Sequence, residues 1–264
     1  MSEKFLSTTV DAVANNVAFQ EFDQTGKQIH AFSAKCMRHM QKDNTHMFTQ
    51  PRIQIISNEQ PPMNLRADNA ISLHSGKTIT FNNNVQLNTI ASAKTPETNV
   101  KTHSLTYLSQ QQKVITKEQV FFVQADTHGQ ARGMTANLAT HQLHLEQDLH
   151  IDQQDTHLRA QNITTYGDAQ HPLLTAKING SELHPAHYWS ILKPNDPAMH
   201  AHADQMLFDN VSQTIDLTGR ARIIQGPQSF TAPRIRYDLA HQHVISSPTN
   251  LARTTIVIYP EQNT

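Results

Sequence analysis

The chain has 264 residues, of which only 16% are charged, and its formal net charge at pH 7 is −1. This length is enough for one large β domain or two modest ones with real cores, and we expect two. Lys and Arg form no cluster and the aromatic residues form no stripe of the kind that follows a nucleic-acid backbone, so nucleic acid is not an expected partner. Gln, Asn, Thr and His replace charged residues, which disfavours long helices.

The single cysteine and the start of the chain restrict the possible classes further. One cysteine, Cys36, excludes an internal disulfide and a four-cysteine zinc site. Cys36 lies in an apolar–polar alternation and is expected to be a small buried hydrophobic residue. No run approaches the roughly 18 apolar residues that cross a bilayer, and residues 1–16 lack the blocks of a signal peptide. As it stands, the sequence predicts a soluble chain without a targeting signal.

The first predicted elements form a β-hairpin. Residues 1–14 show only a weak pattern and are expected to be a flexible N-terminus. Alternation over 16–22 and 28–37, separated by turn residues at 23–26, indicates two antiparallel strands. More strands are expected up to residue 57. Pro61 and Pro62 should end that series, because proline supplies no hydrogen-bond donor to a sheet.

An internal repeat occupies residues 63–124. Leu65 and Val100, or Val85 and Val120, stand in equivalent places about 35 residues apart, a period typical of repeated supersecondary units. Residues 158–166 then match residues 65–73 almost position by position, so the repeat continues beyond the centre of the chain.

Alternation is nearly complete over 143–152, where one face is apolar and the other polar. It breaks between 178 and 197, around Trp189 and several prolines, and resumes from Met199. We interpret the break as a connection or domain boundary. Many short strands separated by turn residues predict an all-β sandwich, barrel or roll.

The 17 histidines suggest metal binding, but their spacing is poor for it. Side chains two residues apart on a strand project to the same side at intervals of about 7 Å. This spacing is too wide for them to bind one ion without ligands from a partner strand. A solvated polar face is therefore preferred, a pH-sensitive surface is an alternative, and no metal site is assigned. The candidate clusters are His200/His202/Asp204, His184/His187, His241/His243 and His141/His144.

Motifs for catalysis are missing from the sequence. There is no nucleophile elbow, no cysteine beside a base and no phosphate-binding glycine loop. Asp68 and Asp204 occur in recurring Ala-Asp pairs and are interpreted as turn carboxylates. We expect no enzyme activity and no cofactor.

The apolar face of the predicted strands is the remaining candidate site. Its residues could form an ordinary core or the lining of an acyl-chain channel, since packing alone stabilises a buried chain by about 0.8 kcal/mol per methylene. Composition does not separate these two possibilities. The candidate lipid-binding groove consists of Leu65, Ile71, Ile79, Phe81, Val85, Leu87, Leu105, Tyr107, Val114, Phe122, Met134, Leu138, Leu143 and Leu145.

A series of weak motifs in a fixed order resembles the LptC lipopolysaccharide-export family, followed by a segment similar to LptA. The LptC-like series spans roughly 14–152 and includes Phe19, Phe22, Gly26, the strand at 31–34, residues 48–51, 65–70, 85–87, 102–107, 116–120, 133–134, 138 and 143–145. The LptA-like series comprises residues 203–204, 208–209, 218–219, 225–226 and 237–238.

This resemblance to the LptC/LptA/OstA-type superfamily implies a β-jellyroll with a V-shaped open groove for the acyl chains of lipopolysaccharide. It implies a non-catalytic transport protein that takes lipopolysaccharide from an inner-membrane LptB-LptF-LptG-type ABC transporter and passes it to an LptA-type periplasmic bridge. Docking would use edge strands, end to end. The implied location is the periplasm, held at the inner membrane by partners or by an N-terminal helix missing from this sequence.

Three departures from the family pattern stand out. Residues 1–16 hold no membrane helix, Asn occupies 82–84 where a glycine is expected, and Arg220, Ala221 and Pro233 replace typical residues. The expected organisation is a flexible 1–14, an LptC-like roll at 15–152, continuing strands and a linker at 153–198, an LptA-like roll at 199–260 and a tail at 261–264. A structural or adhesive β-solenoid with a filled core is the alternative, and a histidine-based metal enzyme or store is a third possibility.

Overall fold

The computed structural model describes residues 10–56, 61–73, 76–91, 96–168, 171, 173–191, 197–241, 243–245 and 255–257. The chain forms two compact units. Unit 1 comprises Met1–Ala125 and Thr135–Ala139, and unit 2 comprises Asp126–Met134 and Thr140–Thr264. The border lies earlier in the chain than the connection expected at 153–198. No helix in the described ranges is long and apolar enough to cross a membrane.

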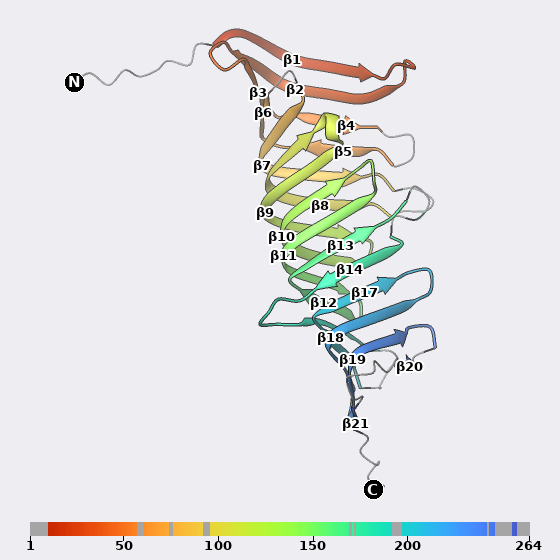
Figure 1. Ribbon diagram of the computed structural model, residues 1–264. Helices are drawn as coiled ribbons and strands as arrows, with labels where there is room; N and C mark the ends of the chain where they lie inside the picture. The colour runs from red at the N-terminus through yellow and green to blue at the C-terminus, as the bar shows by residue number, and fades with distance from the viewer. Residues whose placement is uncertain are drawn as a thin grey trace, which may run out of the picture. The chain divides into compact units, whose positions relative to one another are not determined.

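Unit 1 is built from antiparallel strands that follow one another from the outermost strand β1 (Figure 1). The expected hairpin is present, and the Gly26 N–H closes its turn by donating to the Asp23 carbonyl over 3.0 Å. Strand β1 already begins at Val10, so residues 10–14 belong to this hairpin. The elements are β1 (Val10–Phe22), β2 (Gln28–Met40), β3 (Thr45–Thr49), β4 (Arg52–Ile55), β5 (Met63–Arg66), β6 (Asn69–Leu73), β7 (Thr78–Thr89), β8 (Thr98–Leu108), the 3₁₀ turn η1 (Ser109–Gln111) and β9 (Lys113–Gln124).

Two layers leave β2 and meet again on β7. The first half of β2 pairs with β4, which pairs with β5, and β5 pairs with the second half of β7. The second half of β2 pairs with β3, which pairs with β6, and β6 pairs with the first half of β7. Strand β8 then pairs with β7 along both halves, and β9 pairs with β8. The core of unit 1 lies between the two layers.

Unit 2 repeats this scheme. Strand β11 pairs with β12 at one half and β13 at the other, and the two branches meet again on β18 through β16 and β17. The elements are β10 (Thr127–Asn137), whose last residues belong to unit 1, β11 (Gln142–Gln153), β12 (Thr156–Ala160), β13 (Asn162–Tyr166), β14 (Thr175–Asn179), β15 (Ala186–Ser190), β16 (Met199–Ala203), β17 (Gln205–Asp209), β18 (Thr214–Gln225), β19 (Gln228–Asp238), β20 (His243–Ile245) and β21 (Thr255–Val257).

The all-β jellyroll prediction is therefore confirmed. The matched segments 65–73 and 158–166 have the same structure, because each leaves one layer and enters the other, as β5–β6 and as β12–β13. Leu65 and Leu158, which are equivalent in the repeat, are both buried. The stretch 178–197, expected to be a connection, contains the end of β14 and all of β15.

Long strands bend at residues with positive φ. In β7 the bend lies at Asn83 (φ 63°) and Asn84 (φ 50°), where the register with β8 shifts. In β18 it lies at Gly219 (φ 72°) and Arg220 (φ 45°), where the register with β19 shifts. Asparagine tolerates this conformation better than most residues, so it can replace the glycine that the family pattern led us to expect.

Aspartates hold these bends. The Asp68 N–H donates to the Asn83 carbonyl over 3.0 Å, and Asn84 Nδ2 donates to the Asp68 carboxylate over 2.6 Å. In unit 2 the Asp204 N–H donates to the Gly219 carbonyl over 2.8 Å, and Arg220 Nε donates to the Asp204 carboxylate over 2.5 Å. Each aspartate therefore binds the backbone of a corner with its N–H and a side chain of the same corner with its carboxylate, which agrees with the turn interpretation.

Gly219 gives a direct test of the corner. A Cβ at this position would lie 2.5 Å from an Asp204 carboxylate oxygen and would also adopt an unfavourable φ. Gly219→Ala should therefore lower the free energy of unfolding by more than about 2 kcal/mol, as strain and overpacking add. Gly226→Ala is the control. A Cβ on Gly226 (φ 53°) would meet only the Pro197 ring, at 3.2 Å, so the free energy of unfolding should fall by about 1 kcal/mol. Equal losses in urea denaturation would contradict this account.

Candidate functional site

The structure places most of the predicted groove residues deep in the core. In unit 1, Leu65, Phe81, Val85, Leu105, Tyr107 and Val114 are at most 1% exposed, and Ile79 and Leu87 are also buried. Phe122 and Leu138 are half-buried. Ile71 is 36% exposed, because it points to the opposite face of β6 from buried Ala70 and Ser72. Met134, Leu143 and Leu145 belong to unit 2, where Leu143 is half-buried and the other two are buried.

A cavity of about 410 Å³ lies between the two layers of unit 1, next to the β1–β2 hairpin. Residues from both branches line it, including Phe48 of β3 and Ile53 of β4. The Phe32 ring meets the Phe48 ring edge-on at a centroid distance of 4.7 Å, and the Phe19 ring lies 6.1 Å from the Phe32 ring. The apolar lining consists of Phe19, Phe32, Met37, Phe48, Ile53, Ile79 and the body of Tyr107. This cavity can accept an apolar chain.

A group of polar side chains lines both this cavity and a second one of about 590 Å³. Both are lined by Glu21, His30, Tyr107 and Ser109. His30 Nδ1 lies 2.8 Å from the Glu21 carboxylate, and His30 Nε2 lies 2.7 Å from the Tyr107 hydroxyl. Burial, and then the charge of Glu21, raise the pKa of Tyr107. The hydroxyl therefore stays protonated and serves as a hydrogen-bonding group.

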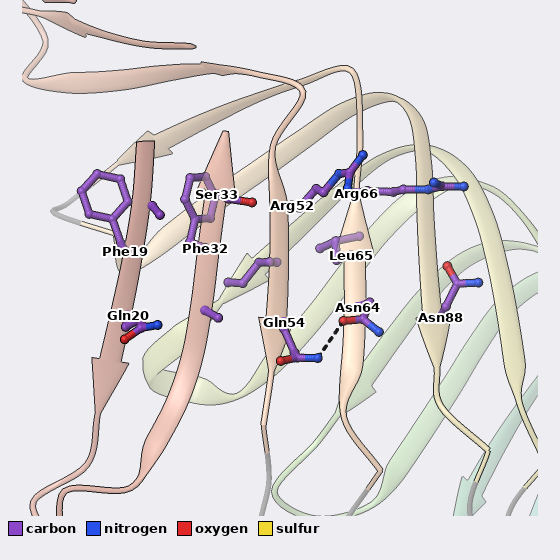
Figure 2. A pocket seen from close by; sticks show the side chains of 13 residues that line it. Phe19, Gln20, Phe32, Ser33, Arg52, Gln54, Asn64, Leu65, Arg66 and Asn88 are labelled. Carbon is purple, nitrogen blue, oxygen red and sulfur yellow. Dashed lines mark hydrogen bonds between the residues drawn. The ribbon is translucent and has the colours of Figure 1, made fainter. Parts of the chain in front are cut away.

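Another concavity, of about 630 Å³, follows a single layer, with contributions from β1, β2, β4, β5 and β7 (Figure 2). Amide and guanidinium groups occupy its edge. Gln54 donates to Asn64 over 3.2 Å, and Arg66 Nη2 donates to Gln86 over 2.6 Å. Arg52 and Arg66 are register partners on adjacent strands. This surface suits polar or anionic groups, whereas the cavity between the layers suits apolar ones.

Sequence reasoning missed the residues at the mouth of the inner cavity. Of the predicted groove set, only Ile79 and Tyr107 line it, while Phe32, Phe48 and Ile53 were treated as parts of ordinary strands. A signal was present, because Phe19 and Phe22 on one predicted strand and Phe32 on the next give the first hairpin several aromatic residues. A hairpin rich in exposed or half-exposed phenylalanine indicates an apolar contact surface.

The histidine clusters resolve into different arrangements. In unit 2, pairing of β15 with β16 places His187 opposite His202 and Trp189 opposite His200. The rings of His187 and His202 stack at 4.1 Å and 12°, and His187 Nε2 lies 3.0 Å from His200 Nδ1. His157 extends the stack by lying over Trp189 at 4.8 Å. We call His157, His187, Trp189, His200 and His202 the imidazole ladder.

The other predicted clusters differ from this ladder. His184 lies exposed in a turn, apart from the stacked rings, and His144 Nδ1 lies 2.8 Å from the Thr164 hydroxyl. His241 and His243 lie close to Asp238. The ladder residues are half-buried, so they are less solvated than the polar-face interpretation supposed.

Burial makes two residues of the imidazole ladder, His187 and His202, resist protonation. Burial, followed by repulsion from His202, His200 and Arg159, lowers the pKa of His187 to about 4. Burial and the charges of His200 and Arg222 also lower the pKa of His202. At neutral pH the His187 and His202 rings are uncharged, and they contribute packing and hydrogen bonding.

Acidification should therefore destabilise unit 2. In the unfolded chain His187 has its ordinary pKa of 6.5, whereas in the folded chain its pKa is about 4. The unfolded chain therefore binds this proton more readily. The contribution of His187 to stability is complete above pH 6.5 and is lost as the pH falls towards 4. His187→Phe keeps a planar ring without a titrating group and should show a smaller loss of urea midpoint between pH 7.5 and 5.0. His184→Asn, outside the ladder, should retain the wild-type loss. Identical losses in wild type and His187→Phe would refute the assignment.

Comparison with known protein families agrees with the resemblance seen in the sequence. A family model described as lipopolysaccharide-assembly, LptC-related, matches residues 2–154. A second, described as LptA/(LptD N-terminal domain) LPS transport protein, matches residues 147–243. No curated protein matches the chain significantly.

Among solved structures, one similar chain is described as LptH, the LptA-homologous periplasmic component of the conserved lipopolysaccharide transport device from Pseudomonas aeruginosa. It is 21% identical, the match covers 51% of this chain and 95% of that chain, and the TM-score is 0.44. The family assignment rests on the sequence models. Because the first of them covers more than half of the sequence, this chain belongs to the LptC-related family of lipopolysaccharide-assembly proteins.

Proposed function

We propose that this chain is a non-catalytic lipopolysaccharide transport protein of the periplasm. It receives lipopolysaccharide from an inner-membrane ABC transporter of the LptB-LptF-LptG type and passes it to an LptA-type bridge that leads to the outer membrane. The observation that carries this proposal is the apolar cavity between the layers of unit 1, in a chain of the LptC-related family. The energy for transport is supplied by the transporter.

The inner cavity has the chemistry that an acyl chain requires. Its walls are the aromatic rings of Phe19, Phe32 and Phe48 together with aliphatic side chains, and each methylene transferred there gains about 0.8 kcal/mol. In this proposal the acyl chain enters beside the β1–β2 hairpin. The deeper groove residues, such as Phe81 and Leu105, are reached only when the two layers separate, because both are at most 1% exposed in this conformation.

The outermost hairpin is the proposed docking surface for the transporter, which would hold the protein at the inner membrane. Strand β1 exposes large apolar side chains, among them Val13 at 60% and Phe22 at 53%. Exposed apolar residues on a terminal strand favour addition of a strand from a partner.

Matches to both an LptC-type and an LptA-type model in one chain support a further element of the proposal. The two models succeed each other at residues 147–154, so one polypeptide carries both modules. The first joint of the bridge would then be covalent, and transfer across it would not depend on association of two chains.

Photo-crosslinking tests the lipid site. A benzoylphenylalanine at Phe32, which lines the cavity, should form adducts with lipopolysaccharide during transport in cells. The matched control is Phe121, an aromatic residue of unit 1 that is 52% exposed on β9. Adducts at Phe32 and none at Phe121 support the proposal, and absence of adducts at Phe32 in active cells would refute it.

Substitution on β1 tests the docking surface. Val13→Asp places a charge on the proposed interface and should weaken co-purification with the inner-membrane transporter at least tenfold, while thermal stability stays near wild type because the side chain is exposed. Val211→Asp, at a position that is 78% exposed in unit 2, is the control. Equal retention of the transporter by both variants would place the docking surface elsewhere.

A further inference from the structure

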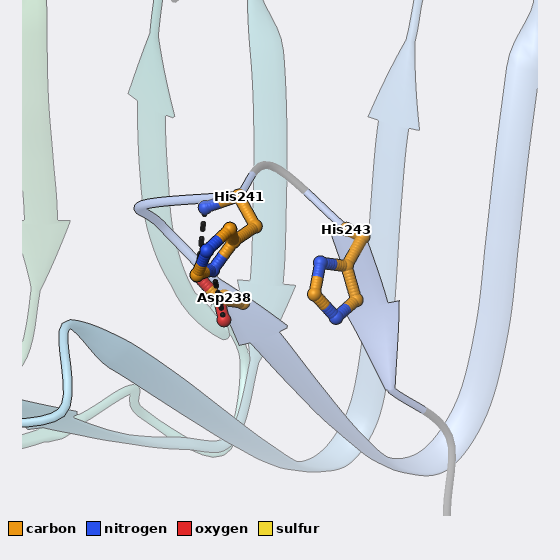
Figure 3. Close-up of side chains that lie close together, drawn as sticks. All are labelled: Asp238, His241 and His243. Carbon is orange, nitrogen blue, oxygen red and sulfur yellow. Dashed lines mark hydrogen bonds and ion pairs between the residues drawn. The ribbon is translucent and has the colours of Figure 1, made fainter.

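We propose that Asp238, His241 and His243 form a binding site for a divalent transition-metal ion at the β19–β20 hairpin (Figure 3). One donor atom from each residue lies within 4.8 Å of the others. Asp238 ends β19 and His243 begins β20, and the two are register partners in the antiparallel pair. His241 lies in the turn between them, so one hairpin supplies all three side chains.

The hairpin holds the carboxylate in place. The His241 N–H donates to Asp238 Oδ1 over 2.8 Å, and His241 Nδ1 lies 3.0 Å from Asp238 Oδ2. The Leu239 N–H donates to the Gln213 carbonyl over 2.9 Å, which fixes the start of the turn.

Only a small movement of the side chains would bring the donor atoms of Asp238, His241 and His243 into a coordination shell around one ion. Ligands about 2.0–2.2 Å from zinc in a tetrahedral site lie roughly 3.3–3.6 Å apart. The His241 side chain is 75% exposed and can rotate without disturbing the core. The His241 and His243 rings are tilted by 52° with centroids 5.9 Å apart, so their edges can turn towards a common point.

The donor set indicates which ions would bind. Two imidazole nitrogens and one carboxylate oxygen suit Zn²⁺, Ni²⁺ and Cu²⁺, whereas Mg²⁺ and Ca²⁺ prefer sites made of oxygen atoms. A divalent ion bound by one carboxylate and two neutral imidazole rings forms a complex with one net positive charge. Three protein ligands also leave coordination positions open to water or to a donor from another molecule.

The imidazole ladder offers a contrast within the same unit. There the rings of His187, His200 and His202 stack within 12–20° of parallel. The 3.0 Å contact between His187 Nε2 and His200 Nδ1 joins only two nitrogen atoms. Pairs such as His157 with Asp152 and His171 with Asp168 bring together one ring and one carboxylate. In the described part of the chain, Asp238, His241 and His243 are the group in which three histidine or carboxylate donors lie within 4.8 Å of one another.

Metal titration of the full chain, purified without a polyhistidine tag, tests the proposal. Calorimetry with Zn²⁺ should show saturable binding at one site per chain, and Mg²⁺ should not compete. His241→Ala and His243→Ala should each weaken binding at least tenfold. His171→Ala is the matched control, because it removes a histidine paired with an aspartate in another turn of unit 2, and it should bind as wild type does.

Copper supplies a second readout that does not depend on affinity. The electron paramagnetic resonance spectrum of one equivalent of Cu²⁺ should show coupling to two nitrogen atoms, and each single His→Ala variant should lose one. Circular dichroism identifies any variant that fails to fold, and His241→Gln then replaces His241→Ala. Unchanged stoichiometry and affinity in both histidine variants, or an equal loss in His171→Ala, would overturn the site. Lipid crosslinking at Phe32 is unaffected by either result.

Discussion

The structure of each unit depends on long strands that pair in two layers at once. A strand that leaves one layer and enters the other must bend, and the bends in β7 and β18 occur at residues with positive φ. Backbone groups freed at the bend still need partners, because an unpaired buried N–H or carbonyl is costly. The N–H groups of Asp68 and Asp204 meet that need for the carbonyls of Asn83 and Gly219, and their carboxylates bind the side chains of Asn84 and Arg220. The two layers stay joined at these corners.

The same geometry creates the cavity. Where β2 divides its pairing between β3 and β4, the layers begin to separate, and the side chains between them do not fill the space completely. Further along, between β7 and β9, residues such as Phe81, Leu105 and Val114 close the interior. Unit 1 thus combines an accessible apolar cavity at the hairpin with a filled core behind it. In the proposed function, the core supplies stability while the cavity remains available to an acyl chain.

Outer faces of the strands carry a different chemistry. Along β12, β16 and β18 the side chains point alternately inward and outward. Leu158, Ala201 and Ile223 point inward, and the neighbouring residues His157, His200, His202 and Arg222 point outward. Cross-strand pairing then stacks the outward rings, and burial followed by repulsion from the neighbouring cations lowers the pKa of His187. The hairpin at the end of β19 places its histidines around a carboxylate instead of in a stack. Identical side chains therefore serve packing at one site and offer metal ligands at another.

Much of the fold could be predicted from local patterns. Period-two alternation determined the all-β class, the first hairpin and the repeat at 65–73 and 158–166, because strand geometry places alternate residues on opposite faces. Turn chemistry correctly indicated the roles of Asp68 and Asp204. Ile71 shows the limit of this reasoning: an apolar residue on a short strand can point outward, and alternation in the sequence does not say which face is covered.

Only the tertiary structure decided which apolar residues are accessible and which side chains meet. Phe81 and Phe32 both belong to apolar faces, yet Phe81 is buried in the core and Phe32 lines a cavity, because the separation of the layers depends on how β2 shares its partners. His187 joined His200 and His202 through pairing between β15 and β16 across the proline-rich stretch. Sequence fixes the alternation within a strand, whereas the distance between layers and the choice of neighbouring strands arise from long-range pairing of the whole unit.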